Sequence, residues 1–271
     1  MVNYMITKFE FQISNYCNRR CPWCPQFFDK KDIKNTIMDE KIIDKMLNNF
    51  IEYNYLFDKN VKIAFTRYNE PIYNHKILYN YSKKVKDFCK KNVNNCIITS
   101  VNTNGDFLNH NTLYSLQYID RITINDYNGL TKSKAMIKIL QLFGLKAYNN
   151  MEINVKDKEI YFNINEQEYT FCYSKNQSIH TRTRGNLLKN FYEIKRDYDC
   201  DIIGKLIEID YNGDVYPCCE VSSMNSEHIE MCCGNILKDN FLDIYNNIQN
   251  IKFDSHLNIC SSCEAYYGLV K

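Results

Sequence analysis

Hydrophobic positions along the first two thirds of the chain switch between the spacing of strands and the spacing of helices. Residues 8–14 alternate apolar and polar positions as a strand does, whereas residues 38–57 carry an apolar stripe with a helical period. The same two patterns predict further strands at 61–65, 95–103 and 120–125, and further helices at 75–91, 111–117 and 131–144. This alternation favours parallel strands joined by helical crossovers.

The pattern is too short for a closed eight-stranded barrel, because only about four strand–helix repeats are clear. The last of these helices is expected to end at Gly144, since glycine is common just after a helix. Residues 145–175 look more like a hairpin than like a strand and a helix. We therefore predict an α/β fold in the form of a partial (β/α)6-type barrel.

A separate small domain is predicted toward the C-terminal end. Alternating residues on both sides of Tyr-Asn-Gly-Asp, between positions 200 and 218, indicate a β-hairpin, and residues 240–251 have helical spacing. We expect a barrel domain over 1–180 and a domain of hairpin plus helix over 181–271.

Charge and glycine content exclude several kinds of function. Lys and Arg number 34 against 32 for Asp and Glu, so the net charge of +2 gives no electrostatic reason to expect nucleic acid or a membrane surface as partner. The 8 glycines include no two that stand two apart, which excludes a dinucleotide fingerprint and a P-loop. No secretory signal or long apolar run is present, so a cytoplasmic location is expected.

Cysteine is frequent, with 13 residues, and in a reducing compartment these are expected to be metal ligands, catalytic thiols or buried residues rather than disulfides. Three lie in "SNYCNRRCPWCPQF", residues 14–27. A wider group near the end consists of Cys200, Cys218, Cys219, Cys232, Cys233, Cys260 and Cys263. The single cysteines Cys89, Cys96 and Cys172 fall on a predicted helix or strands and are interpreted as core residues.

The first group has three cysteines, Cys17, Cys21 and Cys24, where most metal sites need four ligands. A structural zinc site usually takes two separated pairs, and a [4Fe–4S] cluster bound by three thiolates keeps one iron open for another ligand. The spacing favours such a cluster. Zinc with a ligand borrowed from elsewhere, and unligated core cysteines, are the alternatives.

"CNRRCPWC" has the CxxxCxxC spacing of the radical S-adenosylmethionine (SAM) superfamily, with an aromatic residue directly before the third cysteine, and the chain resembles that family. The resemblance implies that Cys17, Cys21 and Cys24 bind a [4Fe–4S] cluster and that Trp23 lies against the adenine of SAM. It also implies reductive cleavage of SAM to a 5′-deoxyadenosyl radical, which abstracts hydrogen from a substrate. A flavodoxin- or ferredoxin-type protein is then the expected electron donor.

The family's Gly-Gly-Glu element corresponds to "RYNEP" here, so both glycines are missing while Glu70 keeps the carboxylate that would bind the SAM amino group. A solvated loop glutamate is the alternative interpretation. Asn104 and Asn125 follow predicted strands and are candidate SAM contacts. Simple turn chemistry is the alternative for both.

The C-terminal cysteines resemble the twitch domain, a shortened relative of the SPASM domain. Its C-x(9–15)-G-x(4)-C element matches Cys200, Gly213 and Cys218, and its closing CxxC matches Cys260 and Cys263. The resemblance implies one auxiliary [4Fe–4S] cluster on these four cysteines, although spacing alone fits zinc equally well. Cys219, Cys232 and Cys233 lie outside the pattern and are interpreted as buried or spare thiols.

Within the twitch enzymes, the chain is similar to the 2-deoxy-scyllo-inosamine dehydrogenase of butirosin biosynthesis in length, in "TNGDFL" at 103–108 and in "TRTRGNLL". This similarity implies that Arg184 and Glu220 face SAM and the substrate. A surface cation and a hairpin-end carboxylate are the respective alternatives.

Three functions are compatible with these motifs. The first is oxidation (dehydrogenation) of a small polyol, sugar or cyclitol, with the auxiliary cluster as electron acceptor. The second is maturation of a ribosomally made peptide, which a start so close to the first strand disfavours. The third is a non-catalytic metal-binding module, against which the open iron argues. Iron and sulfide counts would separate the third from the others, and a neighbouring precursor-peptide gene would separate the second from the first.

Overall fold

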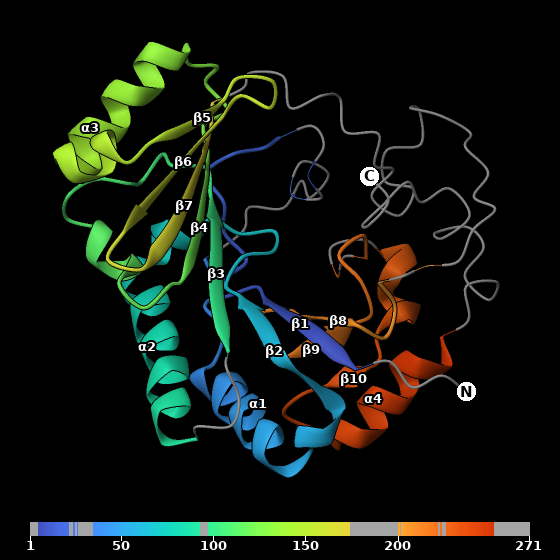
Figure 1. The fold of residues 1–271 in the computed structure, drawn as a ribbon. Coiled ribbons are helices and arrows are strands. Elements are labelled where there is room, and N and C mark those ends of the chain that lie inside the picture. The colour runs from blue at the N-terminus through green and yellow to red at the C-terminus, as the bar shows by residue number, and fades with distance from the viewer. Residues whose placement is uncertain are drawn as a thin grey trace. The chain divides into compact units, whose positions relative to one another are not determined.

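The computed structural model describes residues 5–21, 24, 26, 35–92, 97–173, 200, 202–221, 223 and 226–251 (Figure 1). The chain forms two compact units. The first unit comprises Met1–Val61, Arg67–Asn69 and Ile179–Lys271, and the second comprises Lys62–Thr66 and Glu70–Ser178.

The first unit contains a run of strands in the order β10-β9-β8-β1. Its elements are β1 (Ile6–Phe11), α1 (Glu40–Glu52), η2 (Asn54–Leu56), the start of β2 (Phe57–Ala64), β8 (Leu206–Ile209), β9 (Asp214–Tyr216), η5 (Ser226–Met231), β10 (Gly234–Asn235) and α4 (Phe241–Asn250). Strands β1 and β8 pair in parallel, with Phe9 opposite Ile207. The pairs β8–β9 and β9–β10 are antiparallel. Figure 1 shows α4 beside β10.

Aromatic side chains build the core of the first unit. The ring of Phe50, on α1, lies 5.5 Å from that of Phe9 on β1 and 4.4 Å from that of Phe57 at the start of β2. Phe241 on α4 adds a ring 5.7 Å from that of Phe57. Helix α1 begins where the Asp39 side chain accepts a hydrogen bond from the Lys41 backbone N–H, so its apolar stripe is presented to this cluster from its first turn.

The second unit contains strands in the order β2-β3-β4-β7-β6-β5. Its elements are the end of β2, η3 (Pro71–Asn74), α2 (His75–Lys91), β3 (Ile98–Thr103), η4 (Leu113–Leu116), β4 (Arg121–Asn125), α3 (Lys132–Asn149), β5 (Glu152–Asn154), β6 (Glu159–Ile164) and β7 (Gln167–Cys172). The pairs β2–β3, β3–β4 and β4–β7 are parallel, and the pairs β7–β6 and β6–β5 are antiparallel. Helices α2 and α3 lie on the same side of these strands (Figure 1).

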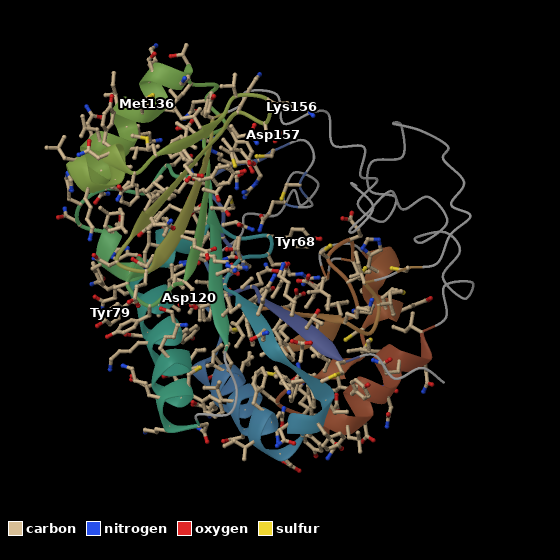
Figure 2. The ribbon with its side chains drawn as sticks, viewed as in Figure 1. Tyr68, Tyr79, Asp120, Met136, Lys156 and Asp157 are labelled. Carbon is tan, nitrogen blue, oxygen red and sulfur yellow. The ribbon has the colours of Figure 1, made fainter. Side chains whose placement is uncertain are left out.

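A carboxylate at the start of β4 ties the neighbouring elements of the second unit together. Asp120 Oδ2 accepts hydrogen bonds from the Thr99 N–H at 2.7 Å and from Lys86 of α2. Figure 2 labels Asp120, Tyr79 of α2, and Lys156 and Asp157 at the turn between β5 and β6. The ring of Phe143, on α3, lies 4.9 Å from that of Tyr169 on β7.

The predicted α/β fold class is confirmed, as is the predicted helix at 75–91, which is α2. The predicted helix at 38–57 is too long, because α1 ends at Glu52 and Phe57 already begins β2. The short helix predicted at 111–117 is the 3-10 turn η4.

Two further predictions concern the part of the chain from α3 to β7. Helix α3 consists of two helical segments that meet at a kink at Gly144, whose φ of 75° favours glycine and is not helical. The predicted end of a helix at Gly144 is therefore confirmed, and a second segment then continues to Asn149. The hairpin predicted within 145–175 is confirmed as β5 and β6, and β7 then pairs in parallel with β4. The domain boundary at residue 180 stays a prediction.

Among the described helices, none combines the length and the apolar character needed to cross a membrane.

Candidate functional site

The first cysteine group lies in the loop that follows β1. Cys17, Cys21 and Cys24 are each half-buried. The Cys24 N–H donates a 2.9 Å hydrogen bond to the Cys21 carbonyl, and Arg20 Nη1 donates a 2.8 Å bond to the Cys17 carbonyl. Backbone contacts therefore shape the loop that carries the three thiols. Trp23 lies outside the described residues.

Gln26, which the sequence did not single out, fixes the far end of this loop. Its side chain is fully buried, and Nε2 donates to the carbonyls of Asn15 at 2.9 Å and Tyr68 at 2.6 Å. The side chain of Asn15 in turn accepts a 2.8 Å bond from the Thr36 N–H. Both ends of the cysteine loop are thus tied to fixed backbone, one by Asn15 and the other by Gln26.

Within the described part of the chain, no three His, Cys, Asp or Glu side chains converge closely enough to hold a metal ion. The loop supplies thiols, which suit an iron–sulfur cluster by their chemistry, but their sulfur atoms are not gathered around a common centre. Metal binding commonly organises the ligands that it needs, so cluster assembly is expected to draw this loop together.

A buried cation lies near this loop in the first unit. The Arg67 side chain is 1% exposed, and it pairs with Glu208 at 3.0 Å between Nε and Oε2 and with Asp210 through Nη1. Its guanidinium stands 5.0 Å from the ring centre of Tyr68 and 5.3 Å from that of Tyr216. Burial of an arginine requires such partners, because a lone charge out of water is very costly.

The two carboxylates of this network come from β8 and its end. All four residues of β8 are buried, and Glu208 and Asp210 are fully buried. Burial raises the pKa of Glu208 well above its ordinary value, the nearby Glu10 carboxylate raises it further, and Arg67 lowers it. The alternating residues 206–210 indicate only one arm of the predicted hairpin, so the sequence pattern does not identify these acidic residues as members of a buried network.

The second cysteine group begins on the hairpin of β8 and β9, whose turn needs Gly213. Its φ of 89° favours glycine, and an added Cβ would meet the Asn235 side chain at 3.3 Å. Cys200, Cys218 and Cys219 all pack against the buried residues Ile202 and Leu206. The structure therefore brings the predicted ligands Cys200 and Cys218 to one apolar cluster, whereas Cys260 and Cys263 lie outside the described residues.

Cys232 and Cys233 follow η5. Cys232 packs with Cys218 on a cluster formed by Tyr216, Val221 and Met231. Cys233 is buried, and burial raises the pKa of its thiol to about 12, which suits an inert core thiol. Both cysteines line a surface pocket of about 240 Å³ together with residues of η5 and α4.

The single cysteines that were predicted as core residues are only partly buried where the structure describes them. Cys89 and Cys172 are half-buried, and burial is the main cause that raises the pKa of Cys172 to about 12. Cys96 lies outside the described residues.

Glu220 directly follows Cys219 in the turn after β9 and is 2% exposed. The Cys219 thiol lies 3.9 Å from Glu220 Oε1. Arg184, its predicted companion at the substrate, lies outside the described residues. The structure therefore describes one member of the predicted pair as a buried carboxylate next to the second cysteine group.

Glu70 is a buried carboxylate in the second unit, at 2% exposure, and is not the solvated loop residue considered as the alternative. Its Oε1 accepts hydrogen bonds from Thr103 Oγ1 at 2.6 Å and from the Ile72 N–H at 3.0 Å, while Oε2 accepts from the Asn104 N–H at 2.8 Å. Burial raises the pKa of Glu70 to about 7, although these hydrogen bonds oppose the shift. The carboxyl group can therefore gain or lose a proton near neutral pH.

The structure brings one of the two predicted asparagines to Glu70. Asn104 is 7% exposed, and its side chain accepts a 3.0 Å hydrogen bond from the Asp106 N–H, as expected of an asparagine in a turn. Gly105 follows with a φ of 74°, and an added Cβ would meet Ile124 at 3.0 Å. Asn125 lies at the end of β4 opposite Cys172 and is half-buried.

Glu70 is expected to make the stability of the protein depend on pH. Because burial raises its pKa from 4.5 to about 7, the folded state binds the proton more tightly and stability falls as pH rises through this window. The full loss corresponds to about 3 kcal/mol. Urea unfolding of the wild type and Glu70→Gln at pH 5 and pH 8 would measure it. An equal pH dependence in both proteins would show that Glu70 does not carry this effect.

A comparison with protein families places the second cysteine group in a known domain. Residues 200–264 match SPASM, an iron–sulfur cluster-binding domain. The matched stretch contains Cys200, Cys218, Cys260 and Cys263, so the resemblance inferred from their spacing is confirmed.

Two solved structures share the fold. A crystal structure of BtrN in complex with AdoMet and 2-DOIA superposes with a TM-score of 0.63 at 17% identity, covering 97% of this chain and 94% of BtrN. Native anSMEcpe with bound AdoMet gives a TM-score of 0.50 at 13% identity, covering 96% of this chain and 92% of that protein. Both of those proteins were solved with AdoMet bound.

A curated relative matches a smaller part of the chain. The uncharacterized protein MJ0907 of Methanocaldococcus jannaschii is 29% identical in an alignment 152 residues long, which covers 51% of this chain and 48% of that protein. The chain therefore matches about half the length of this relative. We conclude that the chain has the fold of the AdoMet-bound protein BtrN and that its residues 200–264 match the SPASM iron–sulfur cluster-binding domain.

Proposed function

We propose that this protein is a radical SAM enzyme with two [4Fe–4S] clusters that oxidises a small polyol, sugar or cyclitol. The observation that carries the proposal is the SPASM match, within which Cys200 and Cys218 pack against the same buried cluster. The CxxxCxxC loop in the same unit, and the fold shared with AdoMet-bound BtrN, support it.

The first cluster is assigned to Cys17, Cys21 and Cys24, whose three thiolates leave one iron open. When bound, SAM and this cluster supply a 5′-deoxyadenosyl radical, and a second cluster supplies an acceptor for one electron. Trp23, Glu70, Asn104 and Asn125 are assigned to SAM. Among the described residues of this set, Glu70 fits a cationic amino group best, because ionisation of a buried carboxyl is favoured by a neighbouring positive charge.

The auxiliary cluster is assigned to Cys200, Cys218, Cys260 and Cys263. Arg184 and Glu220 are assigned to the substrate. Oxidation of a carbinol to a carbonyl removes one hydrogen atom, one proton and one electron. Bound SAM and the auxiliary cluster would supply acceptors for the hydrogen atom and the electron, so the chain itself has to provide a base for the hydroxyl proton. Glu220 is a buried carboxylate beside the auxiliary cysteines, and we assign the proton to it.

Removing the auxiliary ligands should separate the two clusters. Cys200→Ala/Cys218→Ala is expected to lower bound iron from about eight to about four atoms, since each cluster holds four. SAM cleavage should continue while product formation from the substrate is lost. Iron and sulfide analysis with liquid chromatography of 5′-deoxyadenosine would measure both. A full iron content in the double variant would contradict the ligand assignment.

The substrate class is tested by isotope transfer. The reconstituted wild type would be incubated with SAM, a reductant and carbon-deuterated cyclitols, amino sugars and sugars in turn. Deuterium in 5′-deoxyadenosine, together with a carbonyl product in equal amount, would support the proposed oxidation. Transfer only from a peptide would favour the maturase alternative, and the BtrN complex with 2-DOIA supports testing cyclitols first.

A further inference from the structure

The segment Arg67–Asn69 departs from the family pattern and belongs to the first compact unit. Where the radical SAM element has two glycines before its glutamate, this chain has Tyr68 and Asn69. Glycine has no side chain, so any side-chain contact from these two positions is additional to the family pattern. Tyr68 is 6% exposed and is labelled in Figure 2.

Tyr68 connects both cysteine groups. Its carbonyl accepts the 2.6 Å hydrogen bond from Gln26, at the end of the first cysteine loop. Its hydroxyl donates a hydrogen bond to the carbonyl of Cys219, next to Cys218 in the segment that follows β9. One residue thus links the backbone of the two segments that carry the predicted cluster ligands.

Arg67 contacts the same segment after β9, two residues beyond Cys219. Its Nη2 donates a hydrogen bond to the Val221 carbonyl, while Nε and Nη1 pair with Glu208 and Asp210. The Arg67 N–H donates to the Asn69 side chain at 3.0 Å, which orders the segment itself. The guanidinium is therefore held by two buried carboxylates of β8 and its end, and its Nη2 contacts the segment that follows β9.

We propose that Arg67 and Tyr68 form a clamp that positions the turn from Cys218 to Val221. The two bonded carbonyls, of Cys219 and Val221, flank Glu220, and the Val221 N–H donates back to the Cys218 carbonyl at 3.3 Å. Arg67 and Tyr68 act as positioning residues, and this inference rests on the proposed function. The clamp fixes the auxiliary cluster ligand Cys218 and the carboxylate of Glu220 relative to the first cysteine loop.

Contacts of this kind act on a metal centre without ligating it. Hydrogen bonds around a cluster ligand are among the factors that set the reduction potential of an iron–sulfur cluster. The Tyr68 O–H directs the positive end of its dipole toward the Cys219 carbonyl, beside Cys218. Removing it should therefore disfavour the added electron and lower the potential of the auxiliary cluster.

Tyr68→Phe tests the clamp because the ring stays and only the hydroxyl is lost. Amide hydrogen exchange in the metal-free protein, over the peptide 216–221, is expected to become about fivefold faster, as loss of one hydrogen bond predicts. In the reconstituted protein, the one-electron equilibrium of the auxiliary cluster should shift threefold to tenfold toward oxidation, where tenfold corresponds to about 59 mV. Iron content should stay at about eight atoms.

Tyr79→Phe is the matched control, since it removes a hydroxyl from an aromatic cluster with Tyr114 and Tyr118 in the second unit. Neither the exchange rate at 216–221 nor the auxiliary potential should change in this variant. Arg67→Lys keeps the charge but loses the forked geometry, and it should reproduce the effects of Tyr68→Phe.

The inference would be overturned if the amide exchange rate over 216–221 and the reduction potential of the auxiliary cluster stay at the wild-type values in both Tyr68→Phe and Arg67→Lys. This outcome can be told apart from a failure of the proposed function. If the proposed function is wrong, the wild type itself does not hold two clusters. In that case the exchange measurement on metal-free protein would still report on the clamp.

Discussion

Replacing Cys17, Cys21 and Cys24 together by alanine is expected to lower 5′-deoxyadenosine formation at least about a hundredfold, to the rate without protein. The three thiols are half-buried in one loop, and the other described cysteines lie on separate elements. Bound iron should fall from about eight to about four atoms, because the auxiliary ligands remain. Anaerobic reconstitution followed by iron analysis and product chromatography would measure both quantities.

Cys89→Ala is the control for the triple variant. Cys89 is equally half-buried, but it lies on α2 in the second unit and outside both cysteine groups. It should keep the iron content and the cleavage rate of the wild type. SAM cleavage that persists in the triple variant would exclude the loop as the site of the first cluster.

The second large effect is expected on stability. Arg67→Ala leaves Glu208 and Asp210 buried without their cation, which typically costs about 3–5 kcal/mol. Urea unfolding of the metal-free protein would measure the loss. Adding Glu208→Gln to Arg67→Ala should recover part of it, since the double variant has one buried carboxylate fewer.

Lys83→Ala serves as the comparison for Arg67→Ala. It also removes an ion pair, with Asp87 one helical turn away, but both side chains are more than 40% exposed. Its expected cost is therefore below about 0.5 kcal/mol. A loss of less than about 1 kcal/mol for Arg67→Ala would show that the buried network does not stabilise the fold as described.

Features encoded by neighbouring residues were predicted well from the sequence. Helix α2 follows from the apolar period over His75–Lys91, and the β8–β9 hairpin follows from the turn at Gly213. The first cysteine loop was equally predictable from the sequence, because all its thiols lie within eight positions. Local periodicity, turn chemistry and ligand spacing are sufficient for elements of this kind.

Features that depend on contacts between distant positions were not predicted. The parallel pairing of β1 with β8 joins residues that are 198 positions apart, such as Lys8 and Leu206. The partners of Arg67 and the bond from Tyr68 to Cys219 likewise span more than 140 positions. No local pattern encodes such contacts. The alternating pattern of β8 indicates a strand with one exposed face, but both faces of β8 are buried.

Glu70 illustrates the intermediate case. Its match to the glutamate of the family's Gly-Gly-Glu element singled it out, but neither its burial nor its bonds to Thr103 and Asn104 could be predicted. Those bonds bring the end of β3 to the start of η3, which is a tertiary event. The sequence thus identified the residue, and the structure supplied the reason for its raised pKa.

The most direct test of the account is anaerobic reconstitution of the wild type with iron and sulfide, followed by incubation with SAM and a reductant. The account predicts about eight iron atoms per chain, four in each of two clusters, and formation of 5′-deoxyadenosine. Zinc in place of iron, or a full first cluster without SAM cleavage, would contradict the assignment as a radical SAM enzyme.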